Sequence, residues 1–212
     1  MAAIATDTGH AGRTRQVGKA SWRIAALVLA AVLGLAALVP MGQSLWILGK
    51  AHVAQWLIAA AWQDNLDNPS ALRKPWSWAD TTPVARLRFV RQQAQMIVLS
   101  GDSGRILAFG PGHRVGSALP GQGGNSVISG HRDTHFAVLG QVRDTDAIEV
   151  ETLDGQWLRY QVEGRQVVDK HEIGVTRDRG RDELTLVTCW PLDALTAGGP
   201  LRLVVHARRV TS

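Results

Sequence analysis

The stretch Leu184-Thr-Leu-Val-Thr-Cys-Trp-Pro191 decides how the C-terminal part of the chain folds. Its leucines, threonines and valine favour a β-strand. The strand must end near Pro191, because proline has no backbone N–H for the next rung of a sheet. Cys189, the only cysteine among the 212 residues, stands close to that end. The sequence therefore predicts a strand that presents a unique thiol at its C-terminal end.

Similar β-prone runs fill the chain from residue 84 onward, separated by clusters of Gly, Pro and Asp. Apolar and polar side chains alternate most clearly in 157–162 and 201–207. No long amphipathic helical pattern lies between the runs, so the spacing indicates an all-β barrel or sandwich rather than a doubly wound α/β fold. The predicted strands are Val84–Val90, Met96–Leu99, Ile106–Phe109, Ser126–Ser129, Ala147–Glu151, Gln156–Val168, Glu183–Thr188 and Leu201–Ala207.

The N-terminal quarter has the composition of a membrane anchor. From Ile24 to Gly49, 26 consecutive residues carry no charge, whereas about 20 suffice for a helix to cross the hydrocarbon core. Basic residues in the preceding tail place residues 1–23 on the cytoplasmic side. We predict a transmembrane helix over 24–45, kinked or ended by Pro40. A cleaved signal peptide fits less well, because its apolar region is usually only about 7–15 residues long.

Residues 46–82 are predicted to form a juxtamembrane helix and then an irregular linker rich in Asn, Asp and Pro, before a catalytic domain over 83–210. The net charge of +5 lies mainly in residues 1–23, which hold four basic residues and one acidic residue. The domain itself is almost neutral, which excludes a nucleic-acid partner.

The single cysteine excludes an intrachain disulfide and a cysteine-rich zinc cluster. His131 and His135 have a spacing that would bind metal on a helix, but the Gly-His-Arg-Asp context predicts a strand end, where that spacing loses its meaning. We therefore predict no metal and no other cofactor.

Three residues together predict a site for acyl transfer. His131 follows an apolar strand and a glycine, and Arg202 lies in the closing apolar strand. A thiol nucleophile such as Cys189 needs a base or cation beside it; His131 can fill that role and later protonate a leaving amine. Arg202 can stabilise the negative oxygen formed during attack. Each residue alone has a simpler interpretation, with Cys189 as a buried hydrophobe and Arg202 as a solvated strand residue.

The segment Thr185-Leu-Val-Thr-Cys189 resembles the Thr-Leu-x-Thr-Cys signature of the sortases, a family of membrane-anchored cysteine transpeptidases. His131 and Arg202 match the family's upstream histidine and downstream arginine. Residues 76–81, 83–87, 107–113 and 129–136 resemble in particular the class GN branch of proteobacteria. The resemblance covers roughly residues 45–208. It implies an all-β, eight-stranded sortase-type barrel with short helices, preceded by the N-terminal transmembrane helix.

The resemblance also implies an activity and a location. An exported protein with an LPXTG-like C-terminal sorting signal would be cleaved between Thr and Gly through a thioacyl intermediate on Cys189, and the acyl group would pass to an amine. Arg202 would hold the substrate or its oxyanion, and Thr188 would contact the substrate. Asp133 would orient His131 or serve the structure. The catalytic domain would lie in the periplasm, anchored in the inner membrane.

Two other functions stay open at this point. The chain could be a non-catalytic, membrane-anchored β-barrel that binds an envelope protein, with Cys189 buried. It could also be an acyl transferase like the L,D-transpeptidases, although their Ser-x-Gly-Cys-x-Arg motif is absent. The acceptor is open as well: peptidoglycan, another protein and water are all compatible with the sequence.

Overall fold

A computed structural model describes residues 14–194, 196 and 198–210, so the first 13 residues of the predicted cytoplasmic tail lie outside it. The chain divides into two compact units, Met1–Lys50 and Ala51–Ser212. One helix, α1 (Thr14–Asp67), runs from the first unit into the second. Its part from Trp22 onward is long and apolar enough to be a candidate membrane span.

Pro40 lies inside α1, so the helix does not end there, and the alternative that Pro40 kinks it stays a prediction. Strong helix formers flank Pro40 on both sides, and proline removes only one backbone donor from the helix. The hydroxyl of Ser44 donates to the Pro40 carbonyl at 2.9 Å, one turn further along.

In the second unit, residues 51–67 of α1 bury one face. The buried side chains on this face are Ala54, Ile58, Ala61 and Trp62, at helical spacing. Nε1 of Trp62 donates to the Glu151 carboxylate at 3.3 Å, and the Arg86 guanidinium lies over the indole ring. This last part of the helix therefore belongs to the folded domain.

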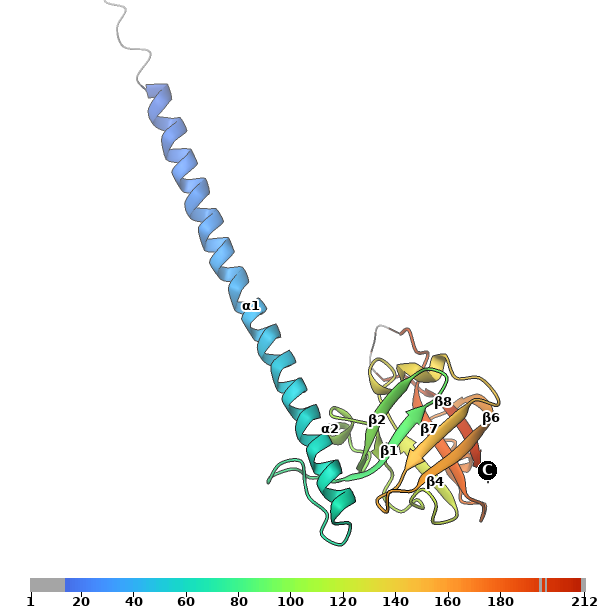
Figure 1. Ribbon diagram of the computed structural model, residues 1–212. Helices are drawn as coiled ribbons and strands as arrows, with labels where there is room; N and C mark the ends of the chain where they lie inside the picture. The colour runs from blue at the N-terminus through green and yellow to red at the C-terminus, as the bar shows by residue number, and fades with distance from the viewer. Residues whose placement is uncertain (1–13, 195, 197, 211–212) are drawn as a thin grey trace, which may run out of the picture. The chain divides into compact units, whose positions relative to one another are not determined.

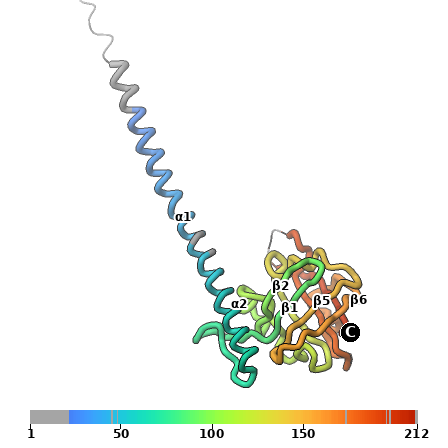
Figure 2. The backbone as a smooth tube through the Cα atoms, viewed as in Figure 1, coloured from blue at the N-terminus to red at the C-terminus, as the bar shows by residue number. Residues whose placement is uncertain are grey.

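The rest of the unit is a closed barrel of eight strands in the order β1-β2-β3-β4-β7-β8-β6-β5, which confirms the predicted fold (Figure 1). The pairs β2–β3 and β4–β7 are parallel, and the others are antiparallel. Figure 2 traces β2, β1, β5 and β6, which lie side by side in that order. The strands are β1 (Pro83–Phe89), β2 (Ala94–Ser100), β3 (Gly112–His113), β4 (Asn125–Ser129), β5 (Ala147–Glu151), β6 (Trp157–Asp169), β7 (Glu183–Trp190) and β8 (Leu201–Arg209).

The described residues also form three short helices, α2 (Gly104–Leu107) and the 3-10 helices η1 (His135–Gly140) and η2 (Ile173–Thr176). The predicted strand Ile106–Phe109 is wrong, because this segment forms α2 and the turn after it. The Ser103 carbonyl accepts hydrogen bonds from the amides of Ile106 and Leu107, which closes a helical turn. The strand at this place is instead the two-residue β3, where a side chain on Gly112 would collide with the Gly101 carbonyl.

The two faces of β7 and β8 determine where reactive groups can lie. Leu184 and Leu186 of β7 and Val205 of β8 belong to the barrel core. Because successive side chains of a strand point to opposite faces, Cys189 and Arg202 lie on the outer face of the barrel wall. The core thus fixes the orientation of the predicted site.

Candidate active site

Three neighbouring strands bring the three predicted residues to one end of the barrel. Cys189 of β7 stands directly opposite Arg202 of β8 in the antiparallel register. The Cβ atoms of such a pair are about 4.5–5.5 Å apart. On the other side of β7, the parallel strand β4 pairs Ser129 with Val187. His131 follows two residues later, level with Cys189.

Cys189 is not fully buried. Cys189 is a free cysteine of intermediate exposure, so the interpretation as a buried hydrophobe does not describe it. His131 is exposed, and Arg202 is partly buried. The arrangement offers a nucleophile, a proton carrier and a cation on adjacent strands, which are the groups that acyl transfer needs.

The backbone around His131 is held on both sides. The Gly130 amide donates to the Val187 carbonyl at 3.0 Å, and the Phe136 amide donates to the His131 carbonyl at 2.9 Å. A Cβ on Gly130 would come within 2.7 Å of the Phe136 ring, so this position requires glycine. The position of His131 therefore depends on close packing between β4 and η1.

Thr188 supports the same segment. Its side chain is buried, and its hydroxyl donates to the Gly130 carbonyl at 2.7 Å. The structure thus gives this hydroxyl a backbone partner next to His131, and its predicted contact with substrate stays a prediction. Asp133 is exposed, and neither role predicted for it is tested by the structure.

A second imidazole lies close to His131. His135 begins η1 and is half-buried. Burial lowers the pKa of His135, and the positive charge of His131 lowers that pKa further. His135 therefore favours its neutral form. Among the described residues, no group of His, Cys, Asp and Glu is arranged to hold a metal ion.

The Arg202 guanidinium forms hydrogen bonds with backbone carbonyls just before β8 and at its first residue. Its Nη1 donates to the Gly199 carbonyl at 3.0 Å and to the Leu201 carbonyl at 2.8 Å. Both bonds come from one nitrogen, and a guanidinium carries three further N–H groups. The observed geometry therefore orients Arg202 and does not use all its donors.

A small cavity of about 80 Å³ extends along the outer face from Arg202. Val187 and Val204, which pair across β7 and β8, line it together with Val175 after β6. Charged groups, among them Arg114 and Lys170, lie at its edge. The cavity is smaller than a typical ligand pocket of about 300–1,000 Å³, and it combines apolar and charged side chains next to Arg202.

Further along the same face, a chain of hydrogen bonds crosses four strands. The Thr185 hydroxyl donates to Asn125 Oδ1 at 2.8 Å and lies 3.3 Å from Nδ1 of His206. Nε2 of His206 lies 3.0 Å from Nε2 of Gln166. Burial, followed by the positive charge of Arg179, lowers the pKa of His206. The sequence did not single out this histidine, because its partners come from strands far apart in the chain.

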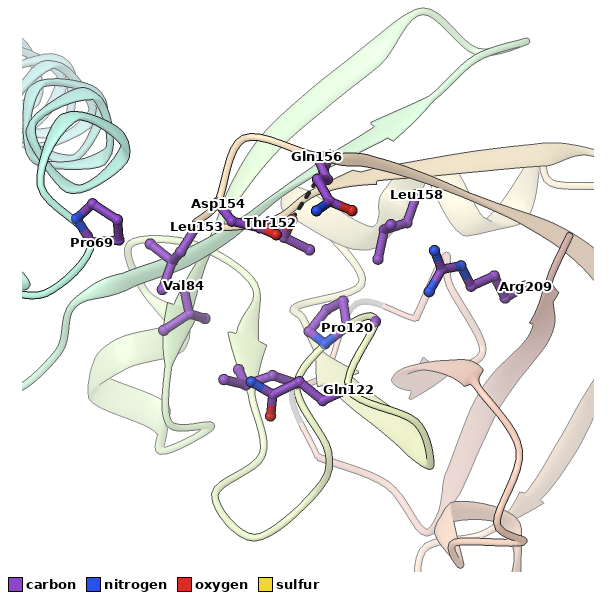
Figure 3. A pocket seen from close by; sticks show the side chains of 12 residues that line it. Pro69, Val84, Pro120, Gln122, Thr152, Leu153, Asp154, Gln156, Leu158 and Arg209 are labelled. Atoms are coloured by element: carbon purple, nitrogen blue, oxygen red, sulfur yellow. Dashed lines mark hydrogen bonds between the residues drawn. The ribbon is translucent and has the colours of Figure 1, made fainter. Parts of the chain in front are cut away.

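A larger cavity of about 360 Å³ lies elsewhere. Figure 3 shows Val84, Pro120, Leu158 and Arg209 around it. Arg209 is the last residue of β8, seven positions beyond Arg202, which corresponds to about 20 Å along a strand. This cavity therefore belongs to the opposite end of the barrel and does not serve Cys189.

Comparison with known proteins agrees with this geometry. A family model described as Sortase domain matches residues 88–210, and the chain belongs to the sortase family. Sortases are cysteine transpeptidases that act on sorting-signal substrates. The L,D-transpeptidase alternative is thereby set aside.

Individual relatives show how far the similarity extends. Sortase D of Bacillus subtilis (strain 168) is 29% identical over 126 residues, which are 59% of this chain and 63% of that protein. The chain thus spans less than two thirds of this curated relative. Sortase C-1 from Actinomyces oris is 30% identical, covering 76% of this chain and 99% of that one with a TM-score of 0.56. Clostridium perfringens sortase C, solved with a C-terminal cell wall sorting motif, is 22% identical over 77% of this chain and 91% of that one, with a TM-score of 0.56, and shows the fold alone.

Proposed function

We propose that this chain is a membrane-anchored cysteine transpeptidase of the class GN branch. It cleaves an LPXTG-like sorting signal through a thioacyl intermediate on Cys189 and transfers the acyl group to an amine. The observation that carries the proposal is the direct pairing of Cys189 with Arg202, with His131 beside them at the end of β4.

The first half of the reaction forms the thioester. The Cys189 thiolate attacks the carbonyl carbon of the Thr–Gly bond, and the electron pair moves to the carbonyl oxygen. Arg202 donates hydrogen bonds to that oxygen, because its guanidinium lies on the neighbouring strand at the same level. As the C–N bond breaks, His131 gives its proton to the leaving amine.

The second half regenerates the enzyme. The acceptor amine attacks the thioester carbon, His131 takes the proton that the amine loses, and the Cys189 thiolate leaves. Water in place of the amine gives hydrolysis. The same three side chains serve both halves, because the second is chemically the reverse of the first.

The cavity on the outer face supports a peptide substrate. Val187 and Val204 offer apolar contacts to the Leu-Pro part of a sorting signal. Their position on β7 and β8, two residues from Cys189 and Arg202, supports a substrate whose Thr–Gly bond lies at the thiol. A C-terminal signal as substrate here is consistent with the structure of Clostridium perfringens sortase C, which was solved with the C-terminal cell wall sorting motif.

The proposed location follows from α1. Its candidate membrane span and the basic residues before it support a single pass through the inner membrane with the N-terminus in the cytoplasm. The catalytic domain then lies in the periplasm, where its partner is an exported protein with an LPXTG-like signal. The amine acceptor is peptidoglycan or another protein, with hydrolysis as the third outcome.

The test is a mass measurement on the full chain in detergent, incubated with LPXTG-like peptides. We expect an acyl adduct on Cys189 and release of the C-terminal fragment. Cys189→Ala must abolish both, and adding an amine must convert the adduct into an amide product. A folded protein with a titratable thiol that yields neither adduct nor cleavage contradicts the proposal. Peptide binding retained by Cys189→Ala without any turnover in the parent chain would favour the non-catalytic binding module.

A further inference from the structure

The residue after His131 makes unusual contacts. Arg132 is 8% exposed. Its Nη2 donates to the Ala194 carbonyl at 2.9 Å and to the Thr196 carbonyl. Both acceptors belong to the segment 191–200, which connects β7 to β8. We call this segment the β7–β8 loop.

At its other end the same loop offers the Gly199 carbonyl to Arg202, which also bonds the carbonyl of Leu201, the first residue of β8. Two arginines from different parts of the barrel therefore hold the described backbone of one loop. One arginine follows the histidine of the site, and the other belongs to the site itself. The loop begins two residues after Cys189 and ends one residue before β8.

Carbonyl oxygens, and no carboxylate, are the partners of Arg132 among the described residues. Among the residues that the structure describes, no carboxylate forms a salt bridge with Arg132. A buried guanidinium without a counter-charge needs carbonyl oxygens, since it has lost most of its contact with water. The loop carbonyls therefore provide partners for Nη2 of Arg132, and Arg132 in turn holds the loop.

We propose that Arg132 is a positioning residue for the transpeptidation: it fastens the β7–β8 loop to the segment that carries His131 and thereby keeps Arg202 oriented toward the oxyanion. The inference rests on the proposed function for its catalytic consequence. Its structural part, the fastening of the loop, stands on the two hydrogen bonds alone. Arg132 itself touches neither the thiol nor the reacting carbonyl.

The effect should fall on kcat rather than on KM. Arg202 stabilises charge that develops only in the transition state, so a displaced guanidinium slows the chemical step and leaves ground-state binding nearly unchanged. For Arg132→Met we expect kcat for peptide cleavage to fall by about 10- to 100-fold, with KM changed less than about twofold. Arg132→Lys keeps a charged donor and should recover part of the rate. Arg159→Met removes an exposed arginine of β6 and should leave both constants unchanged.

A double-mutant cycle tests whether Arg132 acts through Arg202. In a chain that already carries Arg202→Lys, the change Arg132→Met should cost less than about threefold, because the group it positions is gone. Equal and additive losses in both backgrounds would overturn the assigned role. A general loss of stability caused by Arg132→Met would lower the rate in both backgrounds alike. The unfolding temperature of each variant therefore shows whether a lower rate comes from destabilisation or from a displaced Arg202.

Hydrogen exchange tests the fastening without substrate. In Arg132→Met, backbone amides of the β7–β8 loop should exchange faster, while those of β1, β2 and β5 keep their rates. Unchanged exchange in the loop refutes the inference even if the chain is an active transpeptidase. If the loop exchanges faster in Arg132→Met but the parent chain forms no acyl adduct, the proposed function is refuted and the fastening of the loop is established.

Discussion

The hydroxyl of Thr188 donates a hydrogen bond to the carbonyl of Gly130 at 2.7 Å, linking the strand of the nucleophile to the residue before the histidine. Thr188→Val keeps the shape and removes the donor, which leaves a buried carbonyl without this partner. We expect the free energy of unfolding to fall by about 1–3 kcal/mol and the acylation rate to fall with it. Thr188→Ser keeps the hydroxyl and should retain most of the rate. Equal rates for the valine and serine variants would contradict this role.

Gly130→Ala should damage the site by overpacking. The added methyl group would come within 2.7 Å of the Phe136 ring, so either η1 or the His131 backbone must move. We expect a loss of about 1–3 kcal/mol in unfolding free energy and a clear drop in acylation. Gly155→Ala, where nothing lies within 4 Å of the added carbon but the φ of +75° is strained, should lower stability without slowing acylation in the folded fraction.

Arg202→Lys should cost about 100-fold or more in kcat, because a point charge does not reproduce the planar set of donors. Stopped cleavage assays with saturating peptide measure this directly. A turnover close to that of the parent chain would remove Arg202 from the assigned step.

Stability of the barrel should depend on pH through His206. Burial and Arg179 lower its pKa in the folded state, and Glu183 and Glu163 act in the opposite direction. The unfolded imidazole titrates near about 6.5, so protons bind the unfolded chain more readily below that pH. The stabilising contribution is complete above this value and is lost as pH falls.

The measurement is the unfolding temperature between pH 5 and 8, that is, about one to two units on either side of the unfolded pKa. His206→Gln should flatten the curve, with a residual slope from His135, whose pKa is also lowered. If the unfolding temperature of the parent chain does not decrease as the pH is lowered from about 6.5, the role assigned to His206 is contradicted.

Trp62 should be required for the stability of the barrel although it lies before the family-matched region. Its side chain is fully buried and its indole donates to Glu151. Trp62→Ala should lower the unfolding free energy by about 3–5 kcal/mol. Trp56→Ala, at a position that is 70% exposed, should change it by less than about 0.5 kcal/mol. Similar losses for the two variants would contradict the burial argument.

Much of the fold and the site could be predicted because the signals were local. β-Prone runs between Gly, Pro and Asp clusters located seven of the eight strands, and the Thr-Leu-x-Thr-Cys signature led to Cys189 and its candidate partners. The strand predicted over Ile106–Phe109 was wrong because β-prone residues can also form a single helical turn. Here Gly101 has a positive φ, and the Ser103 carbonyl accepts the hydrogen bonds of that turn. Arg132 and His206 carried no local signal, because their hydrogen bonds reach residues 62 and 21 positions away, respectively.

The register of β7 and β8 has a consequence for how sortases of this kind can diverge. Cys189 and Arg202, the proposed nucleophile and its cationic partner, sit on one hairpin, and ladder hydrogen bonds rather than the loop fix the facing positions of their backbones. The connection between them can therefore lengthen, shorten or change sequence while the backbones of Cys189 and Arg202 stay paired, provided that the loop carbonyls bonded by Arg132 and Arg202 are kept. Related enzymes can thus change the loop residues next to the site, and with them the acceptor, while the facing positions of Cys189 and Arg202 are kept.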